Sequence, residues 1–299
     1  MKSIKLLLLF SLVLIIGSCK KENEPTPVTP EAGDTVQLTV ILPDTLKEDN
    51  MLMGNPSDAI MDISFPDNYL MTKDQFTLSY NNTNGTPNWV SWHLSTSWKG
   101  NEPRCDCFTA DNSLPGSFYH TTYSNYTNTG FDRGHMCPSN DRDKTAADNA
   151  ATFLMTNIIP QAPHLNQITW SALENYCQTL LYQGNELYII SGGRGSGGSG
   201  NLGGTTTTIA NGHVNVPSDC WKVIIVVPVG SNDVSRVNSS TRVICVDMPN
   251  TQTVNAQTWG YYRISVDSLE SLTGYNFISA VPDSIQTLVE SFVDTGPTQ

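Results

Sequence analysis

The segment Gly130–Met136 places an acid, a guanidinium group and a glycine directly before His135. A neutral imidazole, with an ordinary pKa near 6.5, can take a proton from water at physiological pH, whereas an arginine cannot. Asp132 is acidic enough to bind a metal itself, and Gly134 would let the backbone approach a bound group closely. Four residues, Asp132–His135, are weak evidence alone, because a lone histidine is usually a packed or exposed side chain.

A second segment adds weight to the first. Thr156–Gln161 is followed by Asn166, Trp170 and Glu174. Apolar residues within 166–181 recur at helical spacing, which predicts an amphipathic helix that Gly184 ends. On a regular helix Asn166 and Glu174 are separated by about 12 Å of rise and lie about 80° past two full turns. One ion could scarcely bind both directly.

Together these segments resemble the DNA/RNA non-specific endonuclease family. The resemblance extends over about residues 51–295, and its separate motifs stand in the family's order and spacing. The remaining matches are Gly54–Ser57, Trp89, Val216–Ser218, Trp221–Val223 and Val281–Asp283.

This resemblance implies a ββα-metal nuclease of the α+β class, with a mostly antiparallel central sheet and flanking helices. The implied reaction is hydrolysis of phosphodiester bonds within DNA and RNA, leaving 5′-phosphate ends. The cofactor would be Mg²⁺, with Mn²⁺ as a possible substitute.

Matching the motifs position by position implies a role for each site residue. His135 would be the general base, Asn166 the direct metal ligand, and Glu174 a ligand acting through a metal-bound water. Asp132 would have a supporting or structural role. The other matches are Asn157 as support for the histidine, and Arg104 and Arg133 as phosphate contacts. Gln178 departs from the pattern, because some members carry arginine there.

The elements around these residues follow from periodicity and turn residues. Two strands, 76–80 and 89–94, joined by a turn over 81–87, predict a hairpin. The Gly- and Ser-rich stretch 192–204 is interpreted as a mobile surface loop. Further strands are expected at 36–42, 186–190, 221–227, 243–246 and 261–266, and helices at 265–273 and 283–293.

The N-terminus has the pattern of an export signal. Lys2 and Lys5 precede an apolar run, Leu6–Ile16, that is too short to span about 30 Å of hydrocarbon. Ile16–Cys19 resembles a bacterial lipobox, so residues 1–18 are predicted to be a signal peptide and Cys19 the lipidated residue. The alternative is ordinary cleavage that leaves Cys19 as a free thiol. Residues 19–50 would form a tether and extension, and the protein would be an exported cell-envelope lipoprotein.

Composition limits how the chain could bind nucleic acid. It has 16 basic and 28 acidic residues, a net charge of −12, and removing the signal would also remove Lys2 and Lys5. This argues against a generic nucleic-acid binder, which uses many cationic contacts. It is compatible with an enzyme that has a local cationic site. Two alternatives remain: a phosphodiesterase for other esters, and a surface-binding lipoprotein that keeps the fold without cleaving.

Six cysteines remain besides Cys19. An even number in an exported chain favours disulfides, with 15 possible pairings. Cys137 stands close to His135 and could be bonded near the site. Zinc is the less favoured alternative, since the chain has no CxxC pair and no HxxxH pair. The six are Cys105, Cys107, Cys137, Cys177, Cys220 and Cys245.

Overall fold

The computed structural model describes residues 49–299. The predicted signal peptide, the lipidation site at Cys19, the strand expected at 36–42 and nearly all of the predicted tether 19–50 therefore lie outside the described residues. None of the helices in residues 49–299 is both long enough and apolar enough to cross a membrane.

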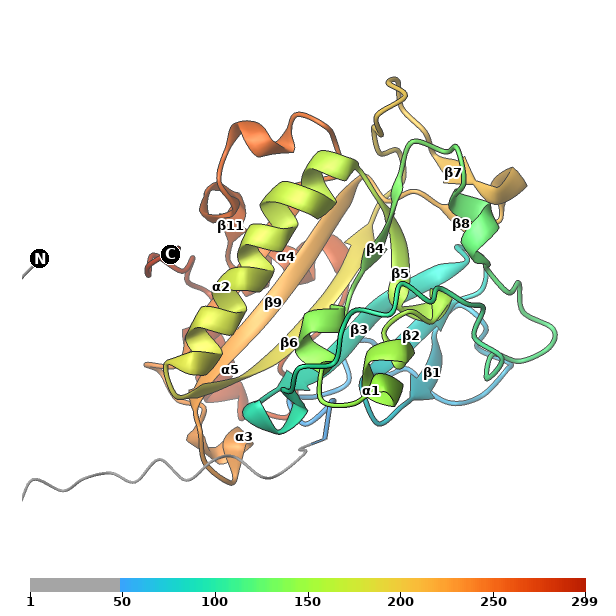
Figure 1. Ribbon diagram of the computed structural model, residues 1–299. Helices are drawn as coiled ribbons and strands as arrows, with labels where there is room; N and C mark the ends of the chain where they lie inside the picture. Colours follow the sequence, from blue (N-terminus) through green and yellow to red (C-terminus); the bar gives the residue numbers. More distant parts are fainter. Residues whose placement is uncertain (1–48) are drawn as a thin grey trace, which may run out of the picture. The chain divides into compact units, whose positions relative to one another are not determined.

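The centre of the fold is a seven-stranded sheet in which every neighbouring pair of strands is antiparallel (Figure 1). The expected hairpin and the antiparallel sheet are confirmed. Its strands, in spatial order, are β1 Tyr69–Thr72, β2 Thr77–Asn81, β3 Thr86–Leu94, β6 Asn185–Arg194, β9 Asp219–Pro228, β10 Arg242–Pro249 and β11 Arg263–Ile264.

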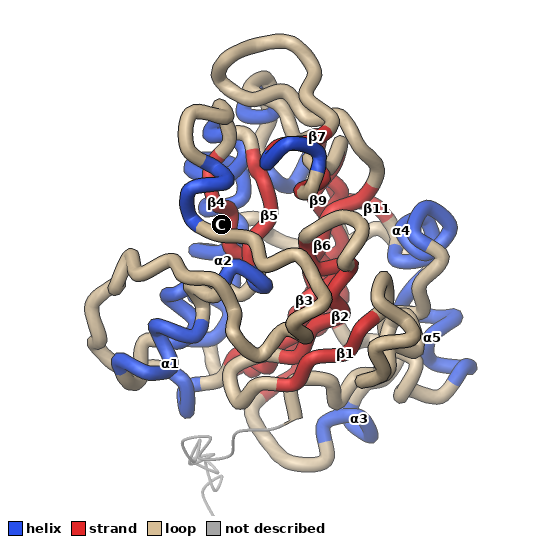
Figure 2. Tube along the Cα trace, turned by 90° about the vertical axis from the view of Figure 1, so that its right-hand side faces the viewer, coloured by secondary structure: helices blue, strands red, loops and turns tan. Residues whose placement is uncertain are grey.

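Helices cover both faces of this sheet, so strands such as β9 are buried on both sides. Cys220 and Ile224 of β9 face a core that includes Leu173 and Leu180 of α2 (Ser171–Tyr182). The alternate residues, such as Val223 and Ile225, face a second core shared with α4 (Val266–Thr273) and α5 (Asp283–Glu290). Figure 2 shows α2 on one side of the strands and α4 and α5 on the other.

A separate two-stranded hairpin lies on the α2 side of the sheet. Its strands are β4 (Asp132–His135) and β5 (Ile158–Gln161), paired antiparallel with His135 opposite Ile158. After β5 the chain enters a π-helical segment, Leu165–Trp170, which continues directly into α2. The order strand, strand, helix is the ββα arrangement that the sequence predicted.

Shorter elements complete the chain. The remaining helices and strands are α1 Ala146–Ala151, α3 Asp233–Arg236, β7 Thr208–Ile209 and β8 Val214–Asn215. Single turns of 3₁₀ helix occupy Thr96–Trp98, Tyr123–Tyr126, Ser139–Arg142, Met155–Asn157, Ala210–Gly212, Val254–Ala256 and Trp259–Tyr262.

Two local expectations were wrong in part. Of the strand predicted at 261–266, only Arg263–Ile264 pairs with β10, because a 3₁₀ turn precedes it and Ser265 caps the start of α4. The stretch 192–204 is not simply a surface loop. Its first three residues belong to β6, and isolated bridges join Gly198 to Thr206 and Ser199 to Thr251.

The expectation that the cysteines form disulfides was also wrong for four of the six. Cys105 and Cys107 form a disulfide, but Cys137, Cys177, Cys220 and Cys245 are buried free thiols. These four lie in the two apolar cores, where cysteine packs as a small hydrophobic residue. Burial raises the pKa of the Cys137 and Cys177 thiols to about 12, so they stay protonated.

Gly134 has a packing role that differs from the one expected. A Cβ added to Gly134 would overlap the side chain of Gln161, which is fully buried on the paired strand β5. The space above the glycine is therefore filled by the protein itself, and it is not left open for a bound group.

Replacing Gly134 by alanine should lower the free energy of unfolding by about 1–3 kcal/mol, because overpacking displaces Gln161. Urea unfolding measures the change. In the double variant Gly134→Ala/Gln161→Ala the new methyl group occupies vacated space, so it should be more stable than Gln161→Ala alone. Wild-type stability of Gly134→Ala would show that the hairpin accommodates the extra atom.

Candidate active site

His135 ends β4 and is only 8% exposed. Two aromatic rings flank it, with centroid distances of 5.3 Å to Phe108 and 4.7 Å to Phe153. Burial, and then the charge of Arg104, lower the pKa of His135 to about 3. The imidazole is therefore neutral at physiological pH. Its Nε2 atom is buried and has no hydrogen-bond partner among residues 49–299.

Asn157 supports the main chain that follows the histidine. Its Oδ1 accepts the Cys137 N–H at 2.9 Å, and its Nδ2 donates to the Cys137 and Thr152 carbonyls, both at 2.8 Å. Its backbone carbonyl accepts the Met136 N–H. Asn157 thus fixes the backbone leaving β4, and no hydrogen bond between its side chain and the imidazole is found in the described chain.

Asp132, at the start of β4, reaches the helix that carries the predicted metal ligand. Its Oδ2 accepts hydrogen bonds from Asn166 Nδ2 at 2.9 Å and from Gln167 Nε2 at 2.8 Å. Asn166 lies in the π-helical turn, which has more residues per turn than an α-helix and so rotates less per residue. The angle between Asn166 and Glu174 around the helix axis is therefore smaller than the one expected for a regular α-helix.

Glu174, in the first turn of α2, faces the sheet. Its Oε1 lies 3.5 Å from the Nζ atom of Lys222 on β9, and Lys222 is 1% exposed. The ammonium group also lies 4.3 Å from the Trp170 ring and 5.5 Å from the Trp92 ring. Burial raises the pKa of Glu174 to about 7, and the charge of Lys222 acts in the opposite direction.

Gln178, one turn beyond Glu174, is buried. Its Nε2 donates to Asp141 Oδ1 at 2.5 Å, and Trp92 Nε1 donates to the other carboxylate oxygen at 2.8 Å. Where some family members have arginine, this chain therefore has a neutral side chain committed to an internal network.

The two predicted phosphate contacts lie on either side of the aromatic residues around His135. The Cζ atom of Arg133 is 3.9 Å from the Tyr123 centroid and 5.1 Å from that of Phe108. The Cζ atom of Arg104 is 4.8 Å from the Phe153 centroid. Arg104 pairs with Asp106, whereas Arg133 has no ion pair within residues 49–299.

The family model described as DNA/RNA non-specific endonuclease matches residues 57–284. A nuclease of Nostoc sp. is 44% identical over 284 residues, covering 95% of this chain and 96% of its own length. The chain belongs to the DNA/RNA non-specific endonuclease family. It is accordingly a phosphodiester hydrolase that acts on nucleic acids.

More distant relatives agree with this assignment. Human mitochondrial endonuclease G is 25% identical over 213 residues, covering 70% of this chain and 69% of its own. A solved structure of the EndoG/EndoGI complex, titled as showing the mechanism of EndoG inhibition, has a TM-score of 0.65 at 22% identity. It covers 79% of this chain and 92% of the matched one. The α+β, ββα-metal fold is confirmed. The match at 57–284 falls inside the predicted domain 51–295, whose ends remain a prediction.

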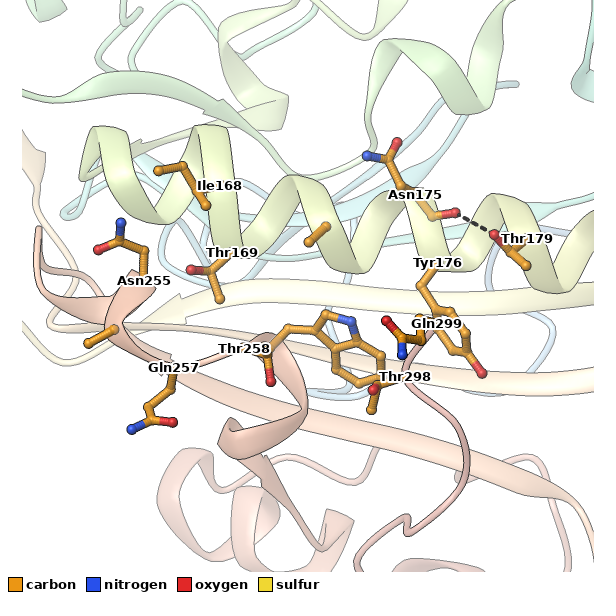
Figure 3. A pocket seen from close by; sticks show the side chains of 13 residues that line it. Ile168, Thr169, Asn175, Tyr176, Thr179, Asn255, Gln257, Thr258, Thr298 and Gln299 are labelled. Carbon is orange, nitrogen blue, oxygen red and sulfur yellow. Dashed lines mark hydrogen bonds between the residues drawn. The ribbon is translucent and has the colours of Figure 1, made fainter.

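Two other features of the endonuclease do not belong to this site. A cavity of about 640 Å³ lies on another face of α2, between that helix and the segment 255–259 (Figure 3), and none of its lining side chains is acidic, basic or a cysteine. A buried group of possible ligands, His93, Glu186 and Asp233, is bridged by Arg236, which pairs with both carboxylates.

No role for Lys222, Phe108 or Phe153 was predicted from the sequence. Lys222 had a signal, because a lysine within the apolar strand 221–227 must either reach solvent or find a buried partner. The two phenylalanines had none, since aromatic residues in loops are common.

Replacing Lys222 by methionine should raise the pKa of Glu174 above about 7, because burial then acts without the opposing cation. Glu174 is protonated below its pKa, so the acidic limb of the rate-against-pH profile should move to higher pH, by about one unit. The measurement is a pH profile at fixed Mg²⁺.

The matched control is Glu174→Gln, in which this limb should disappear because no carboxyl group titrates. An unchanged limb in Lys222→Met would show that Lys222 does not act on Glu174.

Proposed function

We propose that the endonuclease cleaves both DNA and RNA internally, with Mg²⁺ as cofactor, His135 as general base and 5′-phosphate ends as products. The observation that carries this proposal is the hydrogen bond from Asn166 Nδ2 to Asp132. It joins the residue proposed to hold the metal to the strand that bears the proposed base.

The residues around Asn166 fit a magnesium ion. Mg²⁺ prefers oxygen ligands and usually keeps several waters. Because Asp132 engages the amide nitrogen, the Asn166 carbonyl oxygen is the atom left to act as the direct ligand. Glu174 would hold a water of the ion. When bound, the ion would supply positive charge against the phosphate and the leaving oxygen, and Mn²⁺, which also accepts oxygen ligands, could substitute.

His135 is suited to accept a proton from water. Burial keeps the imidazole neutral across the physiological range, with a nitrogen lone pair free to accept a proton, and the same lowering of its pKa makes it a weaker base. Nε2 is shielded from solvent, so Nδ1 would be the accepting nitrogen. Asn157 and the pairing with Ile158 hold the backbone of the histidine, which limits movement of the ring.

Arg133 and Arg104 would bind the phosphate groups of the substrate. Arginine suits this role because its guanidinium group can form paired hydrogen bonds with phosphate oxygens. With a net charge of −12 over the chain, these local cations and the metal would supply most of the attraction for nucleic acid.

His135→Ala should lower the cleavage rate by about 10²- to 10⁴-fold, since it removes the general base. Asn166→Ala should instead weaken metal affinity, so that excess Mg²⁺ or Mn²⁺ partly restores its rate. The assay is metal titration with a defined oligonucleotide, repeated with a DNA and an RNA strand of the same sequence.

Excess metal should not rescue His135→Ala, which makes the two variants controls for each other. Near-normal turnover by His135→Ala at neutral pH would contradict the mechanism. Cleavage of only one of the two strands would contradict the sugar non-specificity.

We also propose that the enzyme is an exported envelope lipoprotein anchored through Cys19. The sequence Ile16–Cys19 and the short apolar run before it support this. Stable anchoring needs more than one acyl chain, and a bacterial lipoprotein would carry several.

Cys19→Ala should move the protein from the membrane to the soluble fraction, or leave the signal uncleaved. Fractionation and mass spectrometry of the N-terminus measure this. A wild-type protein that is already soluble, with a clipped and unlipidated N-terminus, would rule out the anchor.

A further inference from the structure

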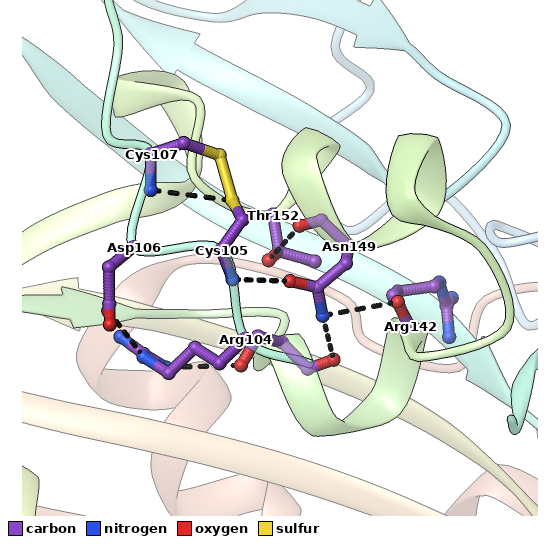
Figure 4. Close-up of a disulfide and its surroundings, with 8 residues drawn as sticks. Arg104, Cys105, Asp106, Cys107, Arg142, Asn149 and Thr152 are labelled. Carbon is purple, nitrogen blue, oxygen red and sulfur yellow. Dashed lines mark hydrogen bonds and ion pairs between the residues drawn. A yellow bond between two sulfur atoms is a disulfide. The ribbon is translucent and has the colours of Figure 1, made fainter. Parts of the chain in front are cut away.

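The segment Arg104–Phe108 runs past the active site and is closed on itself by a disulfide. The bond joins Cys105 to Cys107 across a single residue (Figure 4). All three residues of this loop are exposed. Asp106, at its tip, has a φ of 48°, a left-handed conformation that aspartate tolerates better than most residues.

The residues on either side of this loop both contact the active site. Arg104 lies over the Phe153 ring at 4.8 Å, and His135 packs edge-on against the same ring at 4.7 Å. On the other side, Phe108 is 5.3 Å from the His135 ring and 5.1 Å from the Arg133 guanidinium carbon. The disulfide therefore links a proposed phosphate contact to a wall of the histidine site.

The non-covalent restraints on Arg104 are weak by comparison. Its Nε atom donates to Asp106 at 2.7 Å, but the two side chains are 48% and 69% exposed. Exposed ion pairs of this kind contribute little. Its other hydrogen bond runs from Nη1 to Ser139 Oγ at 3.1 Å. The loop is held against α1 by the Cys105 N–H, which donates to Asn149 Oδ1 at 3.1 Å.

We propose that the Cys105–Cys107 disulfide is a positioning device for the reaction: it holds the Arg104 guanidinium group over Phe153, beside His135, ready to bind a phosphate of the nucleic acid. This inference rests on the proposed function, in which Arg104 is a phosphate contact. Without the bond, Asp106 would lose its fixed conformation and Arg104 would sample positions away from the ring.

A general stabilising role fits the disulfide poorly. The stabilisation that a disulfide provides through the unfolded chain grows with the length of the loop it closes, and this loop is among the shortest possible. Opening the bond should therefore change substrate binding much more than it changes thermal stability.

The reaction that opens the bond is thiol–disulfide exchange with a dithiol. Two electrons and two protons pass from the dithiol to the protein, which gives thiols at Cys105 and Cys107 and a disulfide in the reagent. The exposed bond is accessible to the reagent. Cys137, Cys177, Cys220 and Cys245 are already thiols and are buried, so the treatment leaves them unchanged.

The test compares oxidised and dithiol-reduced full-length protein in two assays. The first measures kcat and KM on a short oligonucleotide with Mg²⁺. The second measures binding of the same oligonucleotide in chelator, where metal-dependent cleavage stops. Reduction should weaken binding and raise KM by about three- to tenfold, which corresponds to the cost of immobilising one long side chain on binding. The melting temperature should change little.

Three variants make the result specific. Cys105→Ser/Cys107→Ser should behave like the reduced enzyme and be insensitive to dithiol. Arg104→Ala should bind more weakly and show no further loss on reduction, whereas Arg104→Lys should retain part of the redox effect.

Equal binding and KM in the oxidised and reduced forms would overturn the inference, and so would a redox effect of full size in Arg104→Ala. If the proposed function is wrong, the two assays give a different result. The protein would not cleave with Mg²⁺ in either redox state, while the redox dependence of binding in chelator would still report the position of Arg104.

Discussion

The hydrogen bond between Asn166 and Asp132 connects the two halves of the active site. Asp132 begins β4 and His135 ends it, and all four residues of that strand are paired with β5. Any shift of the helix relative to the hairpin would therefore change the position of the amide oxygen relative to the imidazole. The π-helical turn at Leu165–Trp170 and the tight packing of Gln161 over Gly134 both serve this contact, since they set where the helix and the strands meet.

A buried ionic group lies directly behind this junction, under α2. Lys222 and Asp141 are almost fully buried, and Glu174 stands at the edge of the group. Burying charges costs free energy unless they are paired and hydrogen-bonded. Here Trp92 and Gln178 satisfy Asp141, while two tryptophan rings enclose the ammonium group of Lys222. Glu174 is therefore the member of the group that remains available to the solvent side, which suits a ligand for water.

Local patterns in the sequence predicted the elements that depend on periodicity: the β2–β3 hairpin, the later long strands, α2, α4 and α5. The four-residue strand Asp132–His135 has no alternation to reveal it, so only the family resemblance placed it in a hairpin. The strand expected at 261–266 was cut short by the cap at Ser265. The state of the cysteines could not be derived from their number, because pairing depends on which thiols meet. Three of the four free ones lie in one apolar core and Cys245 in the other.

The distribution of charge explains how an acidic protein can act on a polyanion. Gln178 is buried and donates a hydrogen bond to Asp141, which Trp92 also hydrogen-bonds. A glutamine at this position adds no cation toward the substrate. In the proposed mechanism, the attraction for phosphate comes from Arg104, Arg133 and the metal. Few phosphate contacts mean weak non-specific binding and a shallow dependence on salt, which favours release of a charged product. In such a site the orientation of each arginine matters more, so a covalent restraint next to Arg104 has a clear physical purpose.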